Sequence, residues 1–522
     1  GSSTGRNIST ATNTAASENT TFGIFLGPNA SGATTAPTAI TTVSTGIVAG
    51  ATATNLIVQN NSVVTAARGI SINGSATTIA PGLQIKKNRI GNSVAGDPDQ
   101  VTSIGISAQG STDAVISENL IWVEGYVRAS TVTHGIDVGA NSTNITGATI
   151  EKNRVNRVKQ NDLQTWAAYG INLAGGSSHI VRNNFVSGVI NDQVGGTGGF
   201  GTTFGAYGIR IAAGTGHFVY HNSVNLYGAM GGVVNTNLTA ALLVVGTGQT
   251  GLDIRNNIFV NTITGGNPTG TRNVAIFLPS GGTAAMNLTL NNNGYFVGAD
   301  ALNRMAQVGA TFGTGEFTLA DFDPTMTTPA TNFRSYSSTL SAAGTNDNAS
   351  LKVDPLFVSN IDLHLQPTSP MQNLGANVSV VDDIDGNMRS ATPEIGADEI
   401  AAVVAPGSLQ FSNATYSGGE AGSPFTVTVT RTGGSDGTVT VDYATSDGTA
   451  TGGAVCGGAV DYVNTNGTLT FLNGETSKTF NVTICNDTTG EPDETIHYAL
   501  TNATGGATIG SPSTAVQTIV DD

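Results

Sequence analysis

A short pattern of aliphatic and polar residues recurs eight times between Val58 and Tyr295. Each copy has an aliphatic residue, two mostly polar residues, an asparagine, one variable residue and a second apolar residue. The asparagines are Asn61, Asn88, Asn119, Asn153, Asn184, Asn222, Asn257 and Asn293. They are separated by 27, 31, 34, 31, 38, 35 and 36 residues. Repeats with periods in this range predict a chain wound into stacked units.

A second pattern, Gly-Ile followed by a variable and an apolar residue, alternates with the first. Its copies begin at Gly69, Gly105, Gly135, Gly170 and Gly208. Each period therefore holds at least two short, β-branched, alternating runs, separated by Gly, Asn, Ser and Thr, and such runs predict strands. Short strands that recur once per coil, with no helical stretch between them, predict an all-β fold, a right-handed parallel β-helix over residues 1–293.

The recurring asparagine has a structural interpretation that we prefer to a ligand role. It falls where the chain must turn between two inward-facing residues. Asparagine tolerates the left-handed conformation, and its amide can bond to the backbone or to the asparagine of the next coil. The pattern therefore predicts a ladder of eight stacked amides.

The organisation changes after Asn293, and residues 294–400 are predicted to form the last coils and a cap. Among the motifs of this segment are Asp354-Pro-Leu-Phe357, His364-Leu-Gln-Pro367 and Ile395-Gly-Ala-Asp-Glu399. With the repeats, they resemble bacterial β-helix surface proteins with a pectate-lyase-like fold. A cap is expected because an open coil end exposes an unpaired strand edge. Asp383-x-Asp385 is interpreted as an Asx turn, since its glycine stands at the wrong offset for an EF-hand.

Residues 401–406 are predicted to be a linker, and residues 407–522 differ in charge and pattern. Residues 402–522 hold 12 of the 36 acidic residues but only 2 of the 20 basic ones. Several runs alternate strictly, among them 425–430, 438–443 and 478–484. Many short alternating strands at this spacing predict an antiparallel β-sandwich.

Motifs in this last quarter resemble a Calx-beta domain, the immunoglobulin-like calcium-binding module of sodium/calcium exchangers and many bacterial surface proteins. The motifs are Asp447-Gly-Thr-Ala450, Asp461-Tyr462, Gly467-Thr-Leu-Thr-Phe471, Gly474-Glu475 and Glu491-Pro-Asp-Glu494. The resemblance implies a Ca²⁺ site with carboxylate ligands and the backbone carbonyl of Thr489. The carboxylates would be those of Glu420, Asp447, Asp487, Glu491, Glu494, Asp521 and Asp522. Asn486 stands where the exchanger pattern has an aspartate, which puts one ion in doubt.

The crowding of acidic residues supports a cation on chemical grounds. Asp487, Glu491, Asp493 and Glu494 fall within eight residues. Calcium needs six to eight oxygen ligands, and clustered carboxylates repel each other unless a cation lies among them. The alternative is a solvated acidic loop.

The chain has two cysteines, Cys456 and Cys485, and both lie in this last quarter. We predict that they form a disulfide, because the secreted context suggested by the composition favours pairing. The alternative is a pair of free, small apolar side chains.

A catalytic site on the β-helix is the main alternative to a structural role. The residues after each Gly-Ile pair form a row, Ser71, Ser107, Asp137, Asn172 and Arg210. Asp137, Asn172 and Arg210 are candidate residues for a polysaccharide lyase, which needs a base and a cation beside the sugar carboxylate. No paired carboxylates at glycosidase spacing are evident, however. The ordinary interpretation of the row is a polar face in solvent.

Aromatic residues suggest a second kind of site. Aromatic rings in or beside the wider loops are candidate platforms for sugars; they belong to Trp122, Tyr126, Trp166, Tyr169 and Tyr207. The alternative is that these rings pack the loops against the coils.

These features together predict an extracellular, secreted and bacterial surface protein. We expect a non-catalytic, adhesin-like or filament-forming structural protein with a calcium-stabilised sandwich. The alternative is a polysaccharide lyase or glycoside hydrolase. Expected partners are a polysaccharide, another cell-surface protein or further copies of the chain. Nucleic acid is not expected, because Glu151 interrupts the row of basic residues Lys86, Arg182 and Arg255. The sequence contains no run of 18 apolar residues, so no membrane span is predicted.

Overall fold

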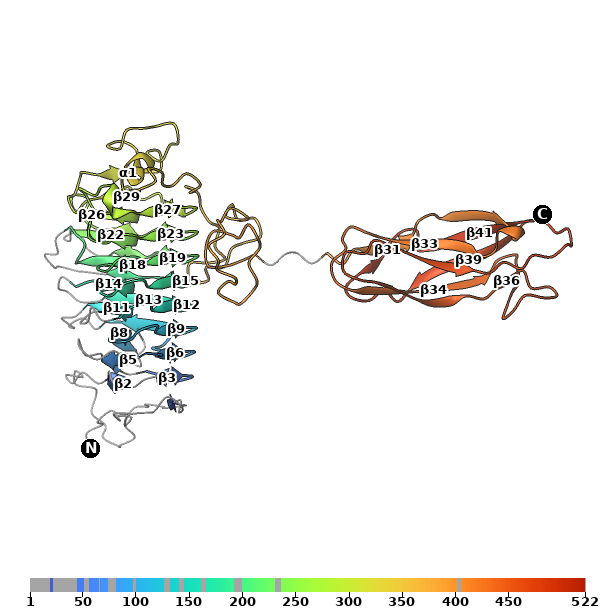
Figure 1. Ribbon diagram of the computed structural model, residues 1–522, viewed down its shortest axis with the longest axis horizontal. Helices are drawn as coiled ribbons and strands as arrows, with labels where there is room; N and C mark the ends of the chain where they lie inside the picture. Colours follow the sequence, from blue (N-terminus) through green and yellow to red (C-terminus); the bar gives the residue numbers. More distant parts are fainter. Residues whose placement is uncertain are drawn as a thin grey trace. The chain divides into compact units, whose positions relative to one another are not determined.

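The computed structural model of the protein consists largely of β-strands and divides into two compact units, residues 1–400 and 401–522 (Figure 1). It describes residues 19–21, 45–50, 56–64, 66–73, 81–96, 100–125, 132–139, 145–160, 166–191, 200–230, 236–400 and 405–521. Within these residues, no helix has the length and apolar character needed to cross a bilayer.

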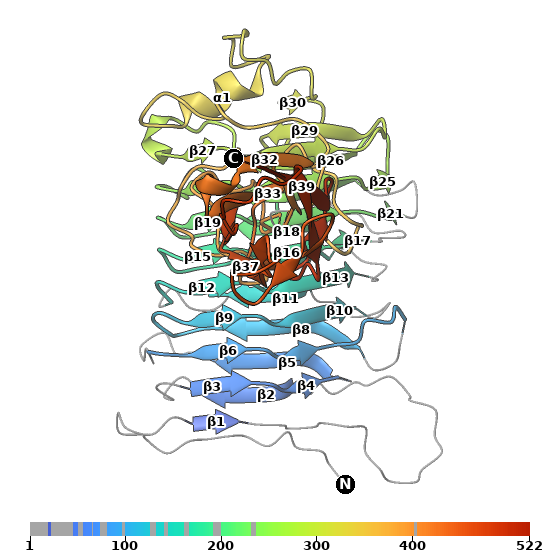
Figure 2. The same cartoon turned by 90° about the vertical axis from the view of Figure 1, so that its right-hand side faces the viewer.

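The first unit is a β-solenoid in which strands of successive coils pair in parallel (Figures 1 and 2). One ladder contains β1 (Asn19–Thr21), β3 (Leu56–Gln59), β6 (Gln84–Lys86), β9 (Val115–Ser117), β12 (Thr149–Glu151), β15 (Ile180–Arg182), β19 (Phe218–Tyr220), β23 (Asp253–Arg255) and β27 (Thr289–Asn291). From β3 onward, each of these strands carries the first aliphatic residue of one asparagine pattern.

Two further ladders complete the coils. The ladder of the Gly-Ile pattern consists of β2 (Thr45–Gly50), β5 (Ala66–Asn73), β8 (Val101–Ala108), β11 (Thr133–Val138), β14 (Ala168–Leu173) and β18 (Gly205–Ile211), and it continues in register, without a Gly-Ile pair, through β22 (Asn237–Val244), β26 (Thr271–Leu278) and β29 (Asn303–Val308). The strands that follow the asparagines are β4 (Ser62–Val63), β7 (Arg89–Ile90), β10 (Leu120–Glu124), β13 (Arg154–Gln160), β16 (Phe185–Ser187), β20 (Ser223–Leu226), β24 (Ile258–Asn261) and β28 (Gly294–Val297). The parallel solenoid predicted from the repeats is therefore confirmed.

Short pairings extend these coils locally. β17 (Ile190–Asn191) pairs with β13, β21 (Ala229–Met230) pairs with β25 (Thr264–Gly265), and β30 (Glu316–Phe317) pairs antiparallel with β29.

The Gly-Ile pattern reflects close packing inside the coil. Ile106, Ile136 and Ile171 are in register on neighbouring coils and fully buried. A Cβ on Gly135 would lie 2.5 Å from the carbonyl oxygen of Gly170, because the next coil passes directly against it. Glycine is needed there for lack of space, while the isoleucine beside it fills the core. Burial of each such side chain contributes about 1.5–3 kcal/mol.

The eight asparagines form the predicted ladder. The side-chain nitrogen Nδ2 of each donates to Oδ1 of the next, over 2.9–3.1 Å. The same Oδ1 accepts the backbone N–H of the preceding asparagine. From Asn88 onward, Nδ2 also donates to a backbone carbonyl on the previous coil, that of the aliphatic residue which begins the asparagine pattern there. The amides thus pair backbone groups that the turn would otherwise leave buried and unpaired.

One expectation about the ladder is wrong. The left-handed conformation falls not on the asparagine but on the residue before it, with φ between 51° and 61°. These residues are Asn60, Lys87, Glu118, Lys152, Asn183, His221, Asn256 and Asn292. The preceding residue takes the sharp bend, and the ladder asparagine is then free to turn its amide into the stack.

The segment after β28 closes the end of the amide ladder. Ser350 Oγ accepts the backbone N–H of Asn293, and Asn346 Oδ1 accepts that of Leu290. α1 (Phe333–Thr339) lies at this end of the solenoid (Figure 1). Next to it, Asp347 is buried and accepts bonds from the hydroxyls of Tyr295 and Ser337. Burial raises the pKa of Asp347 to about 6.

Leu351 forms a last parallel bridge with Gly294 of β28. Residues 352–400 then lie along the side of the stack, and we call them the flank segment. Many of its contacts fall on the bends that precede the ladder asparagines of several coils. Lys152 pairs with Asp382 at 2.7 Å, and Asn256 donates to the carbonyl of Ala376 at 2.7 Å. The segment predicted as a cap therefore has two roles, closing the end and covering one side.

The second unit is a sandwich of two sheets around its own apolar core. One sheet has the order β38 (Ser477–Val482), β33 (Phe425–Thr432), β31 (Ser408–Phe411) and β40 (Thr508–Ile509). The other has the order β32 (Thr415–Gly419), β41 (Thr514–Val520), β39 (Glu494–Thr501), β34 (Val439–Asp447) and β37 (Asn466–Phe471). A two-stranded piece, β35 (Gly452–Gly453) with β36 (Tyr462–Val463), lies outside these sheets.

We predict that Asn184→Ala destabilises the solenoid by at least about 3 kcal/mol, because several buried groups lose their partners. The substitution removes bonds to Ile150, Arg182 and Asn222 and leaves the N–H of Asn153 without its acceptor. Urea unfolding followed by tryptophan fluorescence measures the effect, because both tryptophans of the chain lie in the first unit.

The matched control is Asn377→Ala on the flank segment. Asn377 is exposed and accepts one local backbone N–H, from Ser379. Its loss should cost less than about 1 kcal/mol. Equal effects of the two substitutions would contradict the proposed role of the ladder.

Candidate metal centre

The sheet register of the sandwich brings acidic residues from distant parts of the sequence to one end. Gly419, which precedes Glu420, pairs with Val520, which precedes Asp521. On the next strand, β39, Glu494 pairs with Ile519 of β41. Ile496, two residues further along β39, pairs with Asp447 of β34. The strand ends that carry these residues therefore meet at one edge of the second unit.

Three carboxylates cluster at this end. Asp461, Glu491 and Glu494 each place a carboxylate oxygen within 4.8 Å of the other two. Desolvation, a hydrogen bond with Asp461 and the negative charges of Asp461, Glu491 and Glu420 raise the pKa of Glu494 to about 7. Besides desolvation, the neighbouring negative charges oppose ionisation of Glu494, and a cation among them would relieve this repulsion.

Asp461 is held in place by its backbone as well as its side chain. Its Oδ2 accepts the N–H of Thr451 at 2.7 Å, and its own N–H donates to the carbonyl of Thr451 at 2.9 Å. The N–H of Cys485 donates to the carbonyl of Asp461 at 2.8 Å. The side chain is therefore fixed toward Glu491 and Glu494 before any ligand arrives.

A disulfide strengthens this arrangement. Cys456 and Cys485 are bonded as predicted, with their Cα atoms 5.4 Å apart. The bond ties the Gly-rich insertion before Asp461 to the strand end that leads into the acidic loop 487–494.

The predicted ligands occupy different positions around this centre. Glu420 and Glu491 both act electrostatically on Glu494. Oδ1 of Asp447 accepts the hydroxyl of Tyr462 at 2.6 Å and the N–H of Gly452 at 2.9 Å, and these bonds lower the pKa of Asp447.

Three further predicted ligands belong to the loop and to the last strand. Oδ1 of Asp487 accepts the N–H of Thr489 at 2.6 Å, so both residues lie in one exposed turn. Oδ2 of Asp521 would lie 3.8 Å from a Cβ on Gly490, which places Asp521 beside the same loop. Asp522 lies outside the described residues.

The calcium ligands predicted from the sequence do not include Asp461. The signal was present, because Asp461-Tyr462 is one of the motifs of the resemblance. Its place in the centre depends on the insertion that carries Cys456, and a single sequence does not reveal how such an insertion folds back.

The donor set suits calcium. All the contacting atoms are carboxylate oxygens, and Ca²⁺ takes six to eight oxygen ligands in flexible geometry. Asp461, Glu491 and Glu494 would hold the ion, with Glu420 beside them. The ion would supply the positive charge that this end of the sandwich lacks.

The candidate catalytic row on the solenoid is in register as predicted but is not a solvent face. Nδ2 of Asn172 donates to Oδ1 of Asp137 at 2.8 Å, and Nη1 of Arg210 donates to Oδ1 of Asn172 at 3.0 Å. Asp137 is 1% exposed and also contacts His134. Ser71 and Ser107 of the same row are buried too. The polar groups bind one another, so the expectation of a polar face in solvent is wrong.

The candidate sugar platforms are also largely covered. Tyr169 and Tyr207 are buried and stack with ring centroids 5.5 Å apart, and Arg210 lies over Tyr169. Trp122 is half-buried under Arg89, and Trp166 is half-buried. Tyr126 lies outside the described residues. The tyrosines hold an outer apolar cluster together and do not present their rings to a ligand.

The family model of the Calx-beta domain matches residues 404–522. This segment is a Calx-beta domain. Adhesion G-protein coupled receptor V1 of Danio rerio is 39% identical over 93 residues, 18% of this chain and 1% of the receptor. Sodium/calcium exchanger 1 of Mus musculus is 37% identical over 130 residues, 22% of this chain and 13% of the exchanger. The chain therefore spans only a small part of these relatives.

Two solved structures also match parts of the chain. The apo form of the Calx CBD1 domain is 30% identical, covers 22% of this chain and 96% of its own, and has a TM-score of 0.20. The Dettilon tailspike protein is 14% identical over 51% of this chain and 55% of its own, with a TM-score of 0.22.

We predict that Asp461→Asn lowers the calcium affinity of the Calx-beta domain at least about tenfold, because affinity depends on the number of charged ligands. Calorimetric titration of the full chain with calcium measures the change. Asp442→Asn is the matched control, since its carboxylate binds Thr468 and Asn502 away from the centre. Unchanged affinity in Asp461→Asn would exclude this carboxylate as a ligand.

Proposed function

We propose that the protein is an extracellular structural protein of the cell surface, adhesin-like or filament-forming, in which calcium stabilises the Calx-beta domain. The observation that carries the calcium part is the contact among Asp461, Glu491 and Glu494, with Glu420 acting on the same group. The supporting argument is electrostatic. These acids converge in a unit that has 12 acidic and 2 basic residues, and a divalent cation offsets their repulsion.

The solenoid suits a structural role. Its interior is a continuous apolar core, and its turns are tied by the asparagine ladder. Each coil contacts mainly its neighbours, so such a stack resists bending through many equivalent contacts. The bonding of Asp137 to Asn172 and His134 also favours a structural role over catalysis, because a general base must reach its substrate.

The disulfide supports the proposed location. Disulfides form and persist in oxidising compartments and are uncommon in the bacterial cytosol. Cys456 and Cys485 therefore favour secretion. The proposed partners are a polysaccharide, another surface protein or further copies of the chain.

We predict that excess calcium raises the melting temperature of the Calx-beta domain and leaves the solenoid transition unchanged. At one hundred times the dissociation constant, binding adds about 2.7 kcal/mol, which corresponds to roughly 10 °C for a domain of this size. Differential scanning calorimetry of the full chain, with calcium and with chelator, measures the shift. Tryptophan fluorescence identifies the solenoid transition.

Glu494→Gln should abolish the calcium-dependent shift, whereas Glu475→Gln should keep it. Glu475 binds Lys478 in the turn between β37 and β38, away from Glu420 and Asp461. A Calx-beta transition that is indifferent to calcium in the unsubstituted chain would overturn the proposal.

A further inference from the structure

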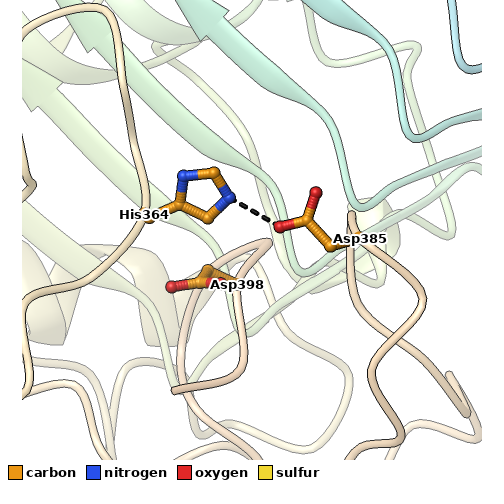
Figure 3. A group of neighbouring side chains, drawn as sticks. All are labelled: His364, Asp385 and Asp398. Atoms are coloured by element: carbon orange, nitrogen blue, oxygen red, sulfur yellow. Dashed lines mark hydrogen bonds and ion pairs between the residues drawn. The ribbon is translucent and has the colours of Figure 1, made fainter. Parts of the chain in front are cut away.

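A second convergence of metal-binding side chains lies in the flank segment of the first unit. Three loops of this segment bring together His364, Asp385 and Asp398 (Figure 3). One ligand atom of each lies within 4.8 Å of the others, a span that one ion can bridge after small side-chain rotations. The group combines an imidazole with two carboxylates, unlike the all-carboxylate centre of the Calx-beta domain.

Each of the three side chains has an outer partner that orients it. Nδ1 of His364 is bonded to Asp362, which directs Nε2 toward Asp385, 2.6 Å away. Arg154 of β13 binds Oδ1 of Asp385 at 2.7 Å, and the N–H of Leu365 donates to Oδ2 of Asp398 at 2.7 Å. Metal ligands in proteins are held by such outer bonds, above all a carboxylate on the second nitrogen of a ligating histidine.

The backbone around these residues is anchored in a small buried core. Leu363, Ile384 and Ala397, each adjacent in sequence to one of the three side chains, pack together on Phe185 of β16. Ala397 also donates its N–H to Ser223, and Ile384 donates to the carbonyl of Ala397. Side chains on loops that share one core are positioned before a ligand arrives.

Negative charge exceeds positive charge at this point. Asp398 is 6% exposed, and the imidazole of His364 and the carboxylates of Asp383 and Asp385 act on it. Arg154 is engaged by Asp385. A buried carboxylate beside two other acids needs a positive partner.

We propose that His364, Asp385 and Asp398 bind a divalent transition-metal ion of the zinc class. An imidazole nitrogen with carboxylate oxygens suits Zn²⁺, whereas Ca²⁺ takes oxygen ligands alone. Three protein ligands leave a fourth tetrahedral position for water. The ion joins three loops of the flank segment. This inference does not depend on calcium binding by the Calx-beta domain.

The test is a calorimetric titration of the metal-free full chain with zinc chloride, in calcium sufficient to saturate the other centre. We expect one zinc ion per chain, and a drop in affinity of at least about tenfold in Asp385→Asn and in His364→Ala, as loss of a ligand implies. His497→Ala is the matched control, because His497 is an exposed histidine of β39 in the other unit.

Two further measurements check that the variants are folded and that zinc stabilises the solenoid. Tryptophan fluorescence melts without zinc confirm that each variant is folded, and zinc should raise the solenoid melting temperature of the unsubstituted chain but not of Asp385→Asn. Equal zinc binding by the unsubstituted chain and both variants would overturn the proposal, as would no zinc binding at all. In that case His364 serves as a charged link between Asp362 and Asp385.

Discussion

The solenoid depends on the pairing of backbone polar groups that its turns bury. The interior of the stack is a buried apolar core, and an unpaired N–H or carbonyl there costs about 1–3 kcal/mol. The asparagine amide meets this constraint with one side chain. Asn184 donates to Ile150 and Asn222 and accepts from Asn153, so it pairs groups on three coils at once. The loops elsewhere differ in length, and the repeat spacing varies between 27 and 38 residues.

The same constraint explains how the ladder ends and how its side is covered. Ser350 and Asn346 supply the acceptors that the next coil would have supplied. Along the side, the flank segment binds polar groups at the bend before the ladder, such as Asn183 and Asn256. In the Calx-beta domain the constraint is electrostatic, because the sheet register brings carboxylates together at one end and their negative charges repel one another. Pairing of the backbone does not relieve that repulsion, and a cation does.

Much of this arrangement could be predicted from the sequence, because it repeats. The strands, the inward isoleucines and the amide ladder follow from periodicity, and the Calx-beta motifs identify the sandwich. Features that depend on how distant loops fold back could not be predicted. The burial of Asp137 and Tyr169 results from coverage of the outer strand face, which the pattern of a single strand does not encode. His179 and His217 are 38 residues apart in the sequence but stack on adjacent coils, where burial lowers both pKa values. Asp461 likewise joins the acidic group through an insertion closed by a disulfide.

The central claim is that calcium binds the acidic end of the Calx-beta domain and that the solenoid folds independently of it. Hydrogen–deuterium exchange of the full chain, with calcium and with chelator, tests this claim at the level of peptides. Calcium should slow exchange around Glu420, in the segment from Asp447 to Asp461 and in the loop 487–494, and leave residues 56–400 unchanged. Exchange in those loops that is indifferent to calcium, or protection confined to the solenoid, would contradict the account.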